Sequence, residues 1–170
     1  MISRKALKEK YKFELAFIIT GFAILTSIFF INRSANNTYK LQEVTDDSTI
    51  ELLHVNSGQI LTLETAATPS KRQQGLMYRK NLKPNAGMFF IFSQEAIQSF
   101  WMKNTSIPLD IIFLDKNLKV VSVHSNTKVN QTSEIYDSKS PSMFVVETIS
   151  GWANSSNLQE GDYFEVKSIK

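Results

Sequence analysis

The twelve residues from Ser99 to Asp110, SFWMKNTSIPLD, combine bulky apolar side chains with ionisable and hydrogen-bonding ones. Strand alternation would place Trp101 and Lys103 on one face and Met102 and Asn104 on the other, so neither face would be uniformly apolar or polar. An aromatic ring beside convergent hydrogen-bonding groups is the composition of many small-ligand sites, sugar sites included. This segment therefore predicts the border of a ligand pocket.

Further polar residues lie within apolar segments elsewhere in the chain. A charge buried on a strand costs several kcal/mol unless it is paired, so Arg79 or Lys103 should face Asp110, Glu147 or a ligand. The candidate ligand-binding residues are Arg79, Trp101, Lys103, Asn104, Asp110 and Glu147. The alternative is a structural network of ion pairs and hydrogen bonds that fixes loops to the sheet.

Two carboxylates also permit an enzymatic interpretation. Glycoside hydrolysis needs a pair of carboxyl groups about 5 to 10 Å apart, and Asp110 and Glu147 are candidates for such a pair. The sequence does not give their separation. We therefore expect binding rather than catalysis and assign no catalytic residue.

The methionines and histidines raise the question of a metal. Met77, Met88 and Met102 lie in three separate segments, and thioethers hold Cu(I) outside the cytoplasm. Met more often fills gaps beside aromatic rings, which are abundant here. His54 and His124 each lie alone in a predicted strand. We expect no metal site and no cofactor.

Several classes of site are excluded. The chain has no cysteine, which excludes disulfides, thiolate catalysis and zinc–sulfur sites. It also lacks a Gly-rich phosphate loop, a GxSxG nucleophile elbow and a basic stripe. We therefore expect no nucleic-acid partner.

The elements that must position these residues are mostly short strands. Alternating or continuous apolar runs bounded by turn residues predict strands at 50–55, 60–65, 88–92, 109–114, 118–124, 143–149 and 163–169. A polar segment from Asn126 to Ser142 is predicted as a long loop. The pattern predicts a mainly β domain, a sandwich or barrel of seven to eight short strands with one short helix.

The helix has a clear start signal. Thr68 is placed as its N-cap and Pro69 as its first residue. Gly75 within the following segment costs about 1 kcal/mol relative to Ala, which indicates close packing or an early helix end.

The amino-terminal region predicts a membrane anchor. Leu15 to Ile31 is a run of seventeen uncharged, mostly apolar residues, and as a helix it would span roughly 26 Å, close to the ~30 Å hydrocarbon core. It is preceded by an excess of basic residues, namely Arg4, Lys5, Lys8, Lys10 and Lys12. Against these five basic residues stand two acidic ones, Glu9 and Glu14, so the whole net charge of +3 lies in the amino-terminal region.

The positive-inside rule then gives the topology. We predict a cytoplasmic basic arm at 1–14, a single transmembrane anchor at 15–31, a flexible tether at 32–48 and an extracytoplasmic β domain at 49–170. A cleaved signal peptide is the alternative, but the apolar run ends in the bulky residues Phe29, Phe30 and Ile31 and is followed by Arg33, instead of ending in small residues. The expected location is the cell membrane, with the membrane itself as a partner.

Four segments together resemble domain-of-unknown-function family 192. They are GLMYR at 75–79, GMFFIF at 87–92, FWMKNTSIPLDIIFLD at 100–115 and FVVETISGW at 144–152. The resemblance runs from about residue 59 to 168 and implies a mainly β, exported or membrane-anchored prokaryotic domain without an established activity. Members often carry a Cys-Pro pair before a Tyr in the long loop, where this chain has Ser133-Glu134-Ile135-Tyr136.

We therefore predict an extracytoplasmic module that binds a small ligand, a glycan or another polar molecule of the cell envelope. Three different functions would also fit these residues: an envelope hydrolase that uses Asp110 and Glu147, a methionine copper site, and an assembly partner for another envelope protein. An assembly partner would expose an apolar patch around Trp101 or Trp152. The residues do not identify a protein partner.

Overall fold

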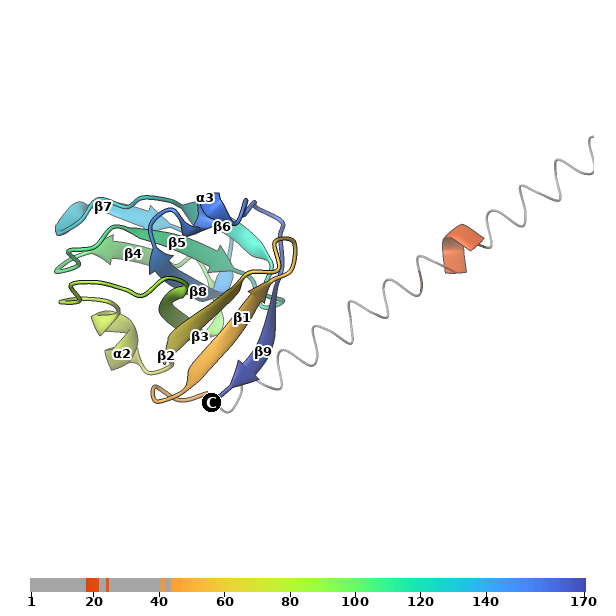
Figure 1. Cartoon of the computed structure of the whole chain (residues 1–170), viewed down its shortest axis with the longest axis horizontal. Coiled ribbons are helices and arrows are strands. Elements are labelled where there is room, and N and C mark those ends of the chain that lie inside the picture. The colour runs from red at the N-terminus through yellow and green to blue at the C-terminus, as the bar shows by residue number, and fades with distance from the viewer. Residues whose placement is uncertain (1–17, 22–23, 25–40, 42–43) are drawn as a thin grey trace, which may run out of the picture. The chain divides into compact units, whose positions relative to one another are not determined.

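The structure, a computed structural model, describes residues 18–21, 24, 41 and 44–170 (Figure 1). The chain divides into two compact units, residues Met1–Asn36 and Asn37–Lys170. In the first unit, the described residues are helical. No helix within the described part of the chain has the length and apolar character of a membrane span. The predicted basic arm, and most of the predicted anchor and tether, lie outside the described residues.

The second unit is mainly β, as the sequence predicted. Its elements are β1 (Thr49–His54), β2 (Ile60–Ala66), α2 (Pro69–Gln74), β3 (Ala86–Ala96), β4 (Ser99–Met102), β5 (Leu109–Leu114), β6 (Val120–His124), β7 (Gln131–Asp137), β8 (Ser142–Ile149), α3 (Trp152–Ser155) and β9 (Phe164–Ile169). Seven strands form one sheet in the order β6-β5-β8-β3-β2-β1-β9, and β4 pairs with β7 in a small second sheet.

The large sheet curls into a half-barrel (Figure 1). Its two edge strands, β6 and β9, meet at their amino-terminal ends, where Lys119 and Tyr163 form a bridge. Backbone hydrogen bonds from Val120 N to the Asp162 carbonyl and from Phe164 N to the Leu118 carbonyl reinforce this contact. The sandwich or barrel of the sequence interpretation is therefore present only in part, as a curled sheet whose edge strands meet at one end.

One strand pair in the sheet is parallel. β2 and β3 run in the same direction, and a parallel pair needs a crossover connection, which α2 provides. The helix begins as predicted, because the Thr68 side chain accepts a hydrogen bond from Lys71 N at 3.2 Å and Pro69 occupies the first turn. It ends early, at Gln74, and Gly75 caps it.

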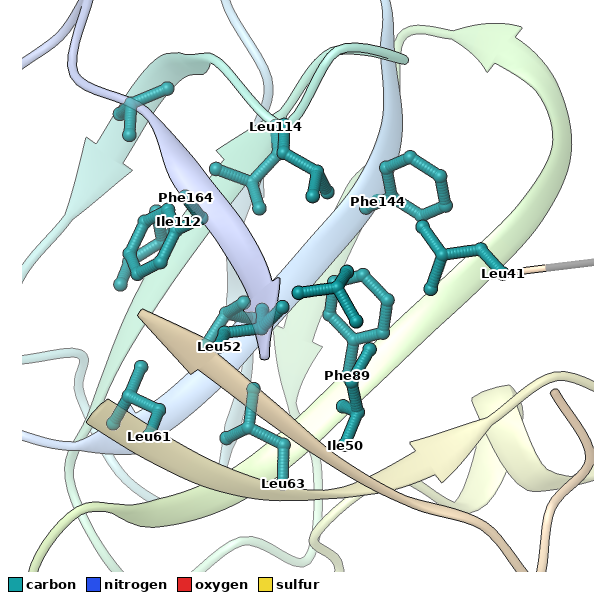
Figure 2. Packing of buried hydrophobic residues seen from close by; sticks show 14 of the residues in the cluster. Leu41, Ile50, Leu52, Leu61, Leu63, Phe89, Ile112, Leu114, Phe144 and Phe164 are labelled. Carbon is teal, nitrogen blue, oxygen red and sulfur yellow. The ribbon is translucent and has the colours of Figure 1, made fainter. Parts of the chain in front are cut away.

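The inner face of the half-barrel holds the larger core. Figure 2 shows Leu52 of β1, Phe89 of β3 and Phe164 of β9 pointing toward one another. Ile112 of β5 enters the same cluster, and the rings of Phe89 and Phe144 stack with centroids 5.3 Å apart. Because all these strands contribute alternate residues, burial of this face stabilises the curl of the sheet.

The outer face of the central strands carries a second core. The small β4–β7 sheet covers it with Met102 and Tyr136, and the residue after the α2 cap, Leu76, packs beside them. Strands β5 and β8 are consequently buried on both faces, and every residue of β5 is buried. This explains why their sequences are continuous apolar runs rather than alternating ones.

The structure contains strand residues that the sequence did not predict. The segment predicted as a long loop contains β7, which pairs antiparallel with β4 through Phe100 and Tyr136. Likewise β3 continues through Ala96. Polar, partly exposed strand residues carry little periodic apolar signal, and tertiary pairing decided their conformation.

Part of the segment predicted as a tether contacts the β domain. Leu41 is buried in the inner core. The carboxylate of Asp46 accepts hydrogen bonds from Ala67 N at 2.7 Å and Thr68 N at 3.0 Å, just before α2. The ordered unit therefore includes residues on the amino-terminal side of β1.

Candidate ligand-binding site

Glu147 is the most unusual residue of the domain. It lies on β8 opposite Met88 of β3 and Ile111 of β5, on the outer face of the sheet. The residue is 5% exposed, and no described residue donates a hydrogen bond to its carboxylate. Burial raises the pKa of Glu147 to about 8. At neutral pH the group is therefore mostly a neutral carboxylic acid, able to donate one hydrogen bond and to accept others.

Glu147 lies at a pocket with a volume of about 270 Å³. The pocket is bordered by α2 and the residues after it, by β3 and by β4. Its lining residues are Arg72, Gln73, Gln74, Gly75, Leu76, Met77, Phe90, Phe92, Gln98, Ser99, Phe100, Trp101, Thr105 and Glu147. Four of these residues are aromatic and seven are polar or charged, so the pocket combines apolar walls with groups that can orient a small ligand.

Aromatic rings provide much of the wall. Phe100 packs edge-to-face with Phe90, with ring centroids 5.0 Å apart, and with Phe92 at 6.5 Å. It also contacts Phe113 in the outer core at 5.8 Å. These contacts fix the rings because edge-to-face pairs are favourable beyond their buried area. Trp101, which is 42% exposed, completes the rim.

Gly75 brings the end of α2 close to the carboxyl group. Its φ of +50° and ψ of −135° are accessible to glycine and strained for other residues. A methyl group at this position would lie 3.6 Å from Glu147 Oε2 and 3.4 Å from Phe90 Cζ. The early helix end and the close packing predicted from the sequence are thus both present, and together they shape the pocket.

Arg72 is the other charged residue among the described residues that line this pocket. Its guanidinium group lies over the ring of Phe92, 5.0 Å from the centroid. One terminal nitrogen, Nη1, donates to the carbonyl oxygens of Ala67 and of Ile91, the latter at 2.8 Å. The side chain is therefore held in place by the backbone and an aromatic face.

A second depression adjoins the first. It has a volume of about 340 Å³ and shares Gln73, Gln74, Met77 and Trp101 with the Glu147 pocket. Lys103 and Asn104 line this second depression. The Lys103 ammonium lies 5.3 Å from the centre of the Trp101 ring, and Asn104 Nδ2 donates to Tyr78 Oη at 2.8 Å. Trp101 therefore connects the two hollows.

The remaining two candidates lie elsewhere. Arg79 pairs with Glu64, with 2.5 Å between Nη2 and Oε2. Asp110 faces the inner side of the half-barrel, where its carboxylate accepts hydrogen bonds from Asn126 N, Gly151 N and Ala153 N at 3.0, 3.1 and 2.8 Å. Asp110 thus orients the loop before β7 and the start of α3, which is a structural role.

The predicted pair of carboxylates is not assembled. Ile112 and Val146 belong to the inner core, whereas Ile111 and Val145 belong to the outer one. Since side chains alternate along a strand, Asp110 and Glu147 project from opposite faces of the same sheet. The geometry that a carboxylate pair needs for glycoside hydrolysis is therefore not met.

The methionines and the second tryptophan also have defined places in the domain. Met88 and Met102 are fully buried in the outer core, and Met102 Sδ accepts a hydrogen bond from Thr127 Oγ1 at 3.3 Å. Met77 lines both hollows. Trp152 is buried and donates to Asn85 Oδ1 at 3.1 Å, so the exposed tryptophan is Trp101.

Sequence reasoning missed most of the pocket wall. Arg72, Phe90, Phe92 and Phe100 were not among the candidates, although they line the same pocket as Glu147. The available signal was Gly75, which indicated close packing at the helix end. What it packs against depends on the approach of α2 to β3 and β8, and no sequence pattern specifies that approach.

Comparisons with known proteins agree with this architecture. The family model of domain-of-unknown-function family 192, described as uncharacterized ACR, matches residues 52–166. No curated protein matches the chain.

Two solved structures are similar to the chain. A transcription-regulator candidate from Sinorhizobium meliloti 1021 is 35% identical, with a TM-score of 0.65 over 73% of this chain and 97% of its own. A protein of unknown function from Novosphingobium aromaticivorans DSM 12444 is 28% identical, with a TM-score of 0.64 over 69% of this chain and 83% of its own. The family match covers most of the β domain, and the chain therefore belongs to domain-of-unknown-function family 192.

Proposed function

We propose that this protein is a membrane-anchored, extracytoplasmic module that binds a small polar ligand, a glycan or another polar molecule of the cell envelope, in the pocket over Glu147. The observation that carries the proposal is a buried carboxyl group without a partner among the described residues, facing a pocket with aromatic walls. Leaving a polar group unsatisfied costs about 1–3 kcal/mol. A ligand that hydrogen-bonds to Glu147 would recover that cost.

Binding is favoured over hydrolysis by the composition of the pocket. Among the described residues, Glu147 is the one carboxyl group that lines it, and Asp110 lies on the opposite face of the sheet. A general acid without a second carboxylate, a metal ligand set or an activated nucleophile is not sufficient for a hydrolase. It is sufficient to orient a bound molecule.

Ligand screening of the full chain in detergent tests the proposal. We expect at least one of a panel of cell-wall sugars, amino acids and small polar metabolites to raise the thermal midpoint of the wild-type protein. The same ligand should lose at least tenfold in affinity to Glu147→Gln, measured by calorimetry. The matched control is Asp47→Asn, which removes a carboxylate from an exposed residue away from the pocket.

Two results would contradict the proposal. The first is the absence of any response from a folded wild-type protein across the panel. The second is a ligand that binds equally well to Glu147→Gln and to the wild type, because binding would then take place elsewhere.

A further inference from the structure

The Glu147 pocket contains one basic and one acidic side chain that do not pair with each other. Neither Arg72 nor Glu147 forms an ion pair with any described residue. Nη1 of Arg72 donates hydrogen bonds to two carbonyl oxygens, and the guanidinium group lies over the ring of Phe92. Its other nitrogens have no acceptor among the described residues. Glu147 is buried and accepts no hydrogen bond from them. The pocket thus offers one cationic and one acidic group to whatever enters it.

The aromatic walls favour a positive charge near Glu147. Phe90, Phe100 and Trp101 line the pocket together with the carboxyl group, and the faces of aromatic rings attract cations, most strongly where water is excluded. Phe92 already has the Arg72 guanidinium over its ring, and Trp101 has the Lys103 ammonium 5.3 Å from its centre, which leaves Phe90 and Phe100. An ammonium group is therefore best accommodated by the other rings, close to Glu147.

We propose that the ligand of this pocket is a small zwitterion, with Glu147 as the counter-ion of its ammonium group and Arg72 as the counter-ion of its carboxylate. This inference rests on the proposed function and names the ligand class.

Other ligand charges satisfy the pocket less well. A simple cation would pair with Glu147 but would be repelled by Arg72. A simple anion would pair with Arg72 and leave the carboxyl group without an ionic partner. A neutral sugar would leave the Arg72 charge uncompensated. A zwitterion alone provides a partner for both groups and adds no net charge to the site.

Ionisation of Glu147 then couples binding to pH. Met88 of β3, Ile111 of β5, Phe100 of β4 and Gly75 after α2 surround the carboxyl group and do not titrate. Arg72 keeps its charge throughout. Lys103 lines only the adjoining depression and is exposed. Because the pKa of the empty site is about 8, affinity for a permanent cation should fall about tenfold for each pH unit below 8.

Matched probes separate the two charges. Glycine betaine carries a permanent ammonium group and a carboxylate. The anion 3,3-dimethylbutanoate has the same shape without the positive charge. Choline keeps the ammonium group but has a hydroxymethyl group in place of the carboxylate. In calorimetry on the full chain in detergent at pH 8.5, we expect betaine to bind at least tenfold more tightly than either of the other two. Its affinity should decrease at pH 6.5.

Variants assign the charges to residues. Glu147→Gln should lower betaine affinity at least tenfold and remove its pH dependence, while the affinity for 3,3-dimethylbutanoate does not fall. Arg72→Gln should lower the affinity for betaine but not for choline. Arg72→Lys keeps the charge and should retain more binding, which covers the case in which the glutamine variant does not fold. Asp47→Asn should resemble the wild type.

Three outcomes would overturn the inference. Equal binding of betaine and 3,3-dimethylbutanoate would exclude Glu147 as a counter-ion, and equal binding of betaine and choline would exclude Arg72. Binding of N-acetylglucosamine, in a Glu147-dependent manner and without any binding of betaine, would exclude the zwitterion but keep the proposed function. If no probe or panel ligand binds the folded protein, both proposals fail.

Discussion

Residue scale: an acid without a partner inside a folded domain destabilises that domain when it ionises. Glu147 accepts no hydrogen bond from the described residues, and desolvation raises its pKa from 4.5 to about 8. Asp110, equally buried on the neighbouring strand, accepts three backbone N–H groups. Two carboxylates adjacent in the sheet thus have different roles, because one is satisfied by its surroundings and the other is not.

The raised pKa of Glu147 predicts how stability changes with pH. Between pH 4.5 and about 8 the folded state binds more protons at this residue than the unfolded state does. The free energy of unfolding should therefore decrease as the pH rises through this window, with a limiting slope of about 1.4 kcal/mol per pH unit and a total of a few kcal/mol. Urea unfolding of the wild-type protein at pH 5, 6, 7 and 8 measures this.

Glu147→Gln provides the comparison, since its amide does not titrate. The variant should show a flatter profile over the same window and should be the more stable protein at pH 8. Glu51 does not interfere: a hydrogen bond from Ser168 lowers the pKa of Glu51, so its contribution is lost only as the pH falls below its usual range. Parallel profiles for variant and wild type would show that Glu147 is not desolvated.

Element scale: the pocket depends on how closely α2 and β3 approach β8 and on the position of β4. Gly75 at the end of α2 lies close to the Glu147 side chain, and β3 pairs with β8 along Gly87 to Ile91. Strand β4 is hydrogen-bonded to β7. At Gly87 the approach is closest, because an added Cβ would lie 2.0 Å from the Glu147 carbonyl oxygen. A backbone atom cannot move aside as the end of a flexible side chain can, so this position requires glycine.

Gly87→Ala should consequently be severely destabilising. We expect a loss of at least about 3 kcal/mol, or failure to fold, since β3 must move away from β8 to admit the methyl group. Gly58→Ala is the matched control: the new Cβ would meet no atom within 4 Å, and only the cost of its positive φ of 73° remains, about 1 kcal/mol. Equal thermal midpoints for the two variants would refute the close β3–β8 approach.

Whole-molecule scale: the β domain and the amino-terminal region make separate contributions. The unit from Asn37 to Lys170 contains both cores and both hollows. It includes Leu41, which is buried, and Asp46, whose carboxylate binds the backbone before α2. The segment 15–31, which we propose as a membrane anchor, belongs to the other unit.

We therefore predict that the full chain fractionates with membranes and needs detergent for extraction, whereas a fragment that begins at Asn37 is soluble and folded. A shorter fragment that begins at Thr49 should unfold at a lower temperature, because it loses the burial of Leu41 and the contacts of Asp46. Protease should degrade the domain when it is added to cells whose outer layers have been removed and whose cytoplasmic membrane is intact. Protection of the domain, or a soluble full chain, would refute the proposed topology.

The sequence by itself determined the elements whose cause is local. The Thr68–Pro69 helix start follows from capping chemistry, strands β1 and β9 follow from apolar alternation, and strands β5 and β8 follow from continuous apolar runs. It also indicated the mainly β class and two of the residues that line the Glu147 pocket, Trp101 and Glu147. These features can be recognised in the chain because the interactions responsible for them span only a few residues.

Tertiary structure alone decided which residues meet. It made β7 a strand by pairing it with β4, placed Asp110 and Glu147 on opposite faces, and brought Arg72 and Phe92 to the same pocket as Glu147. Each outcome depends on strand order and on how closely α2 approaches the sheet. Contacts of this kind join residues far apart in the chain, and their energy appears only after the fold has brought them together.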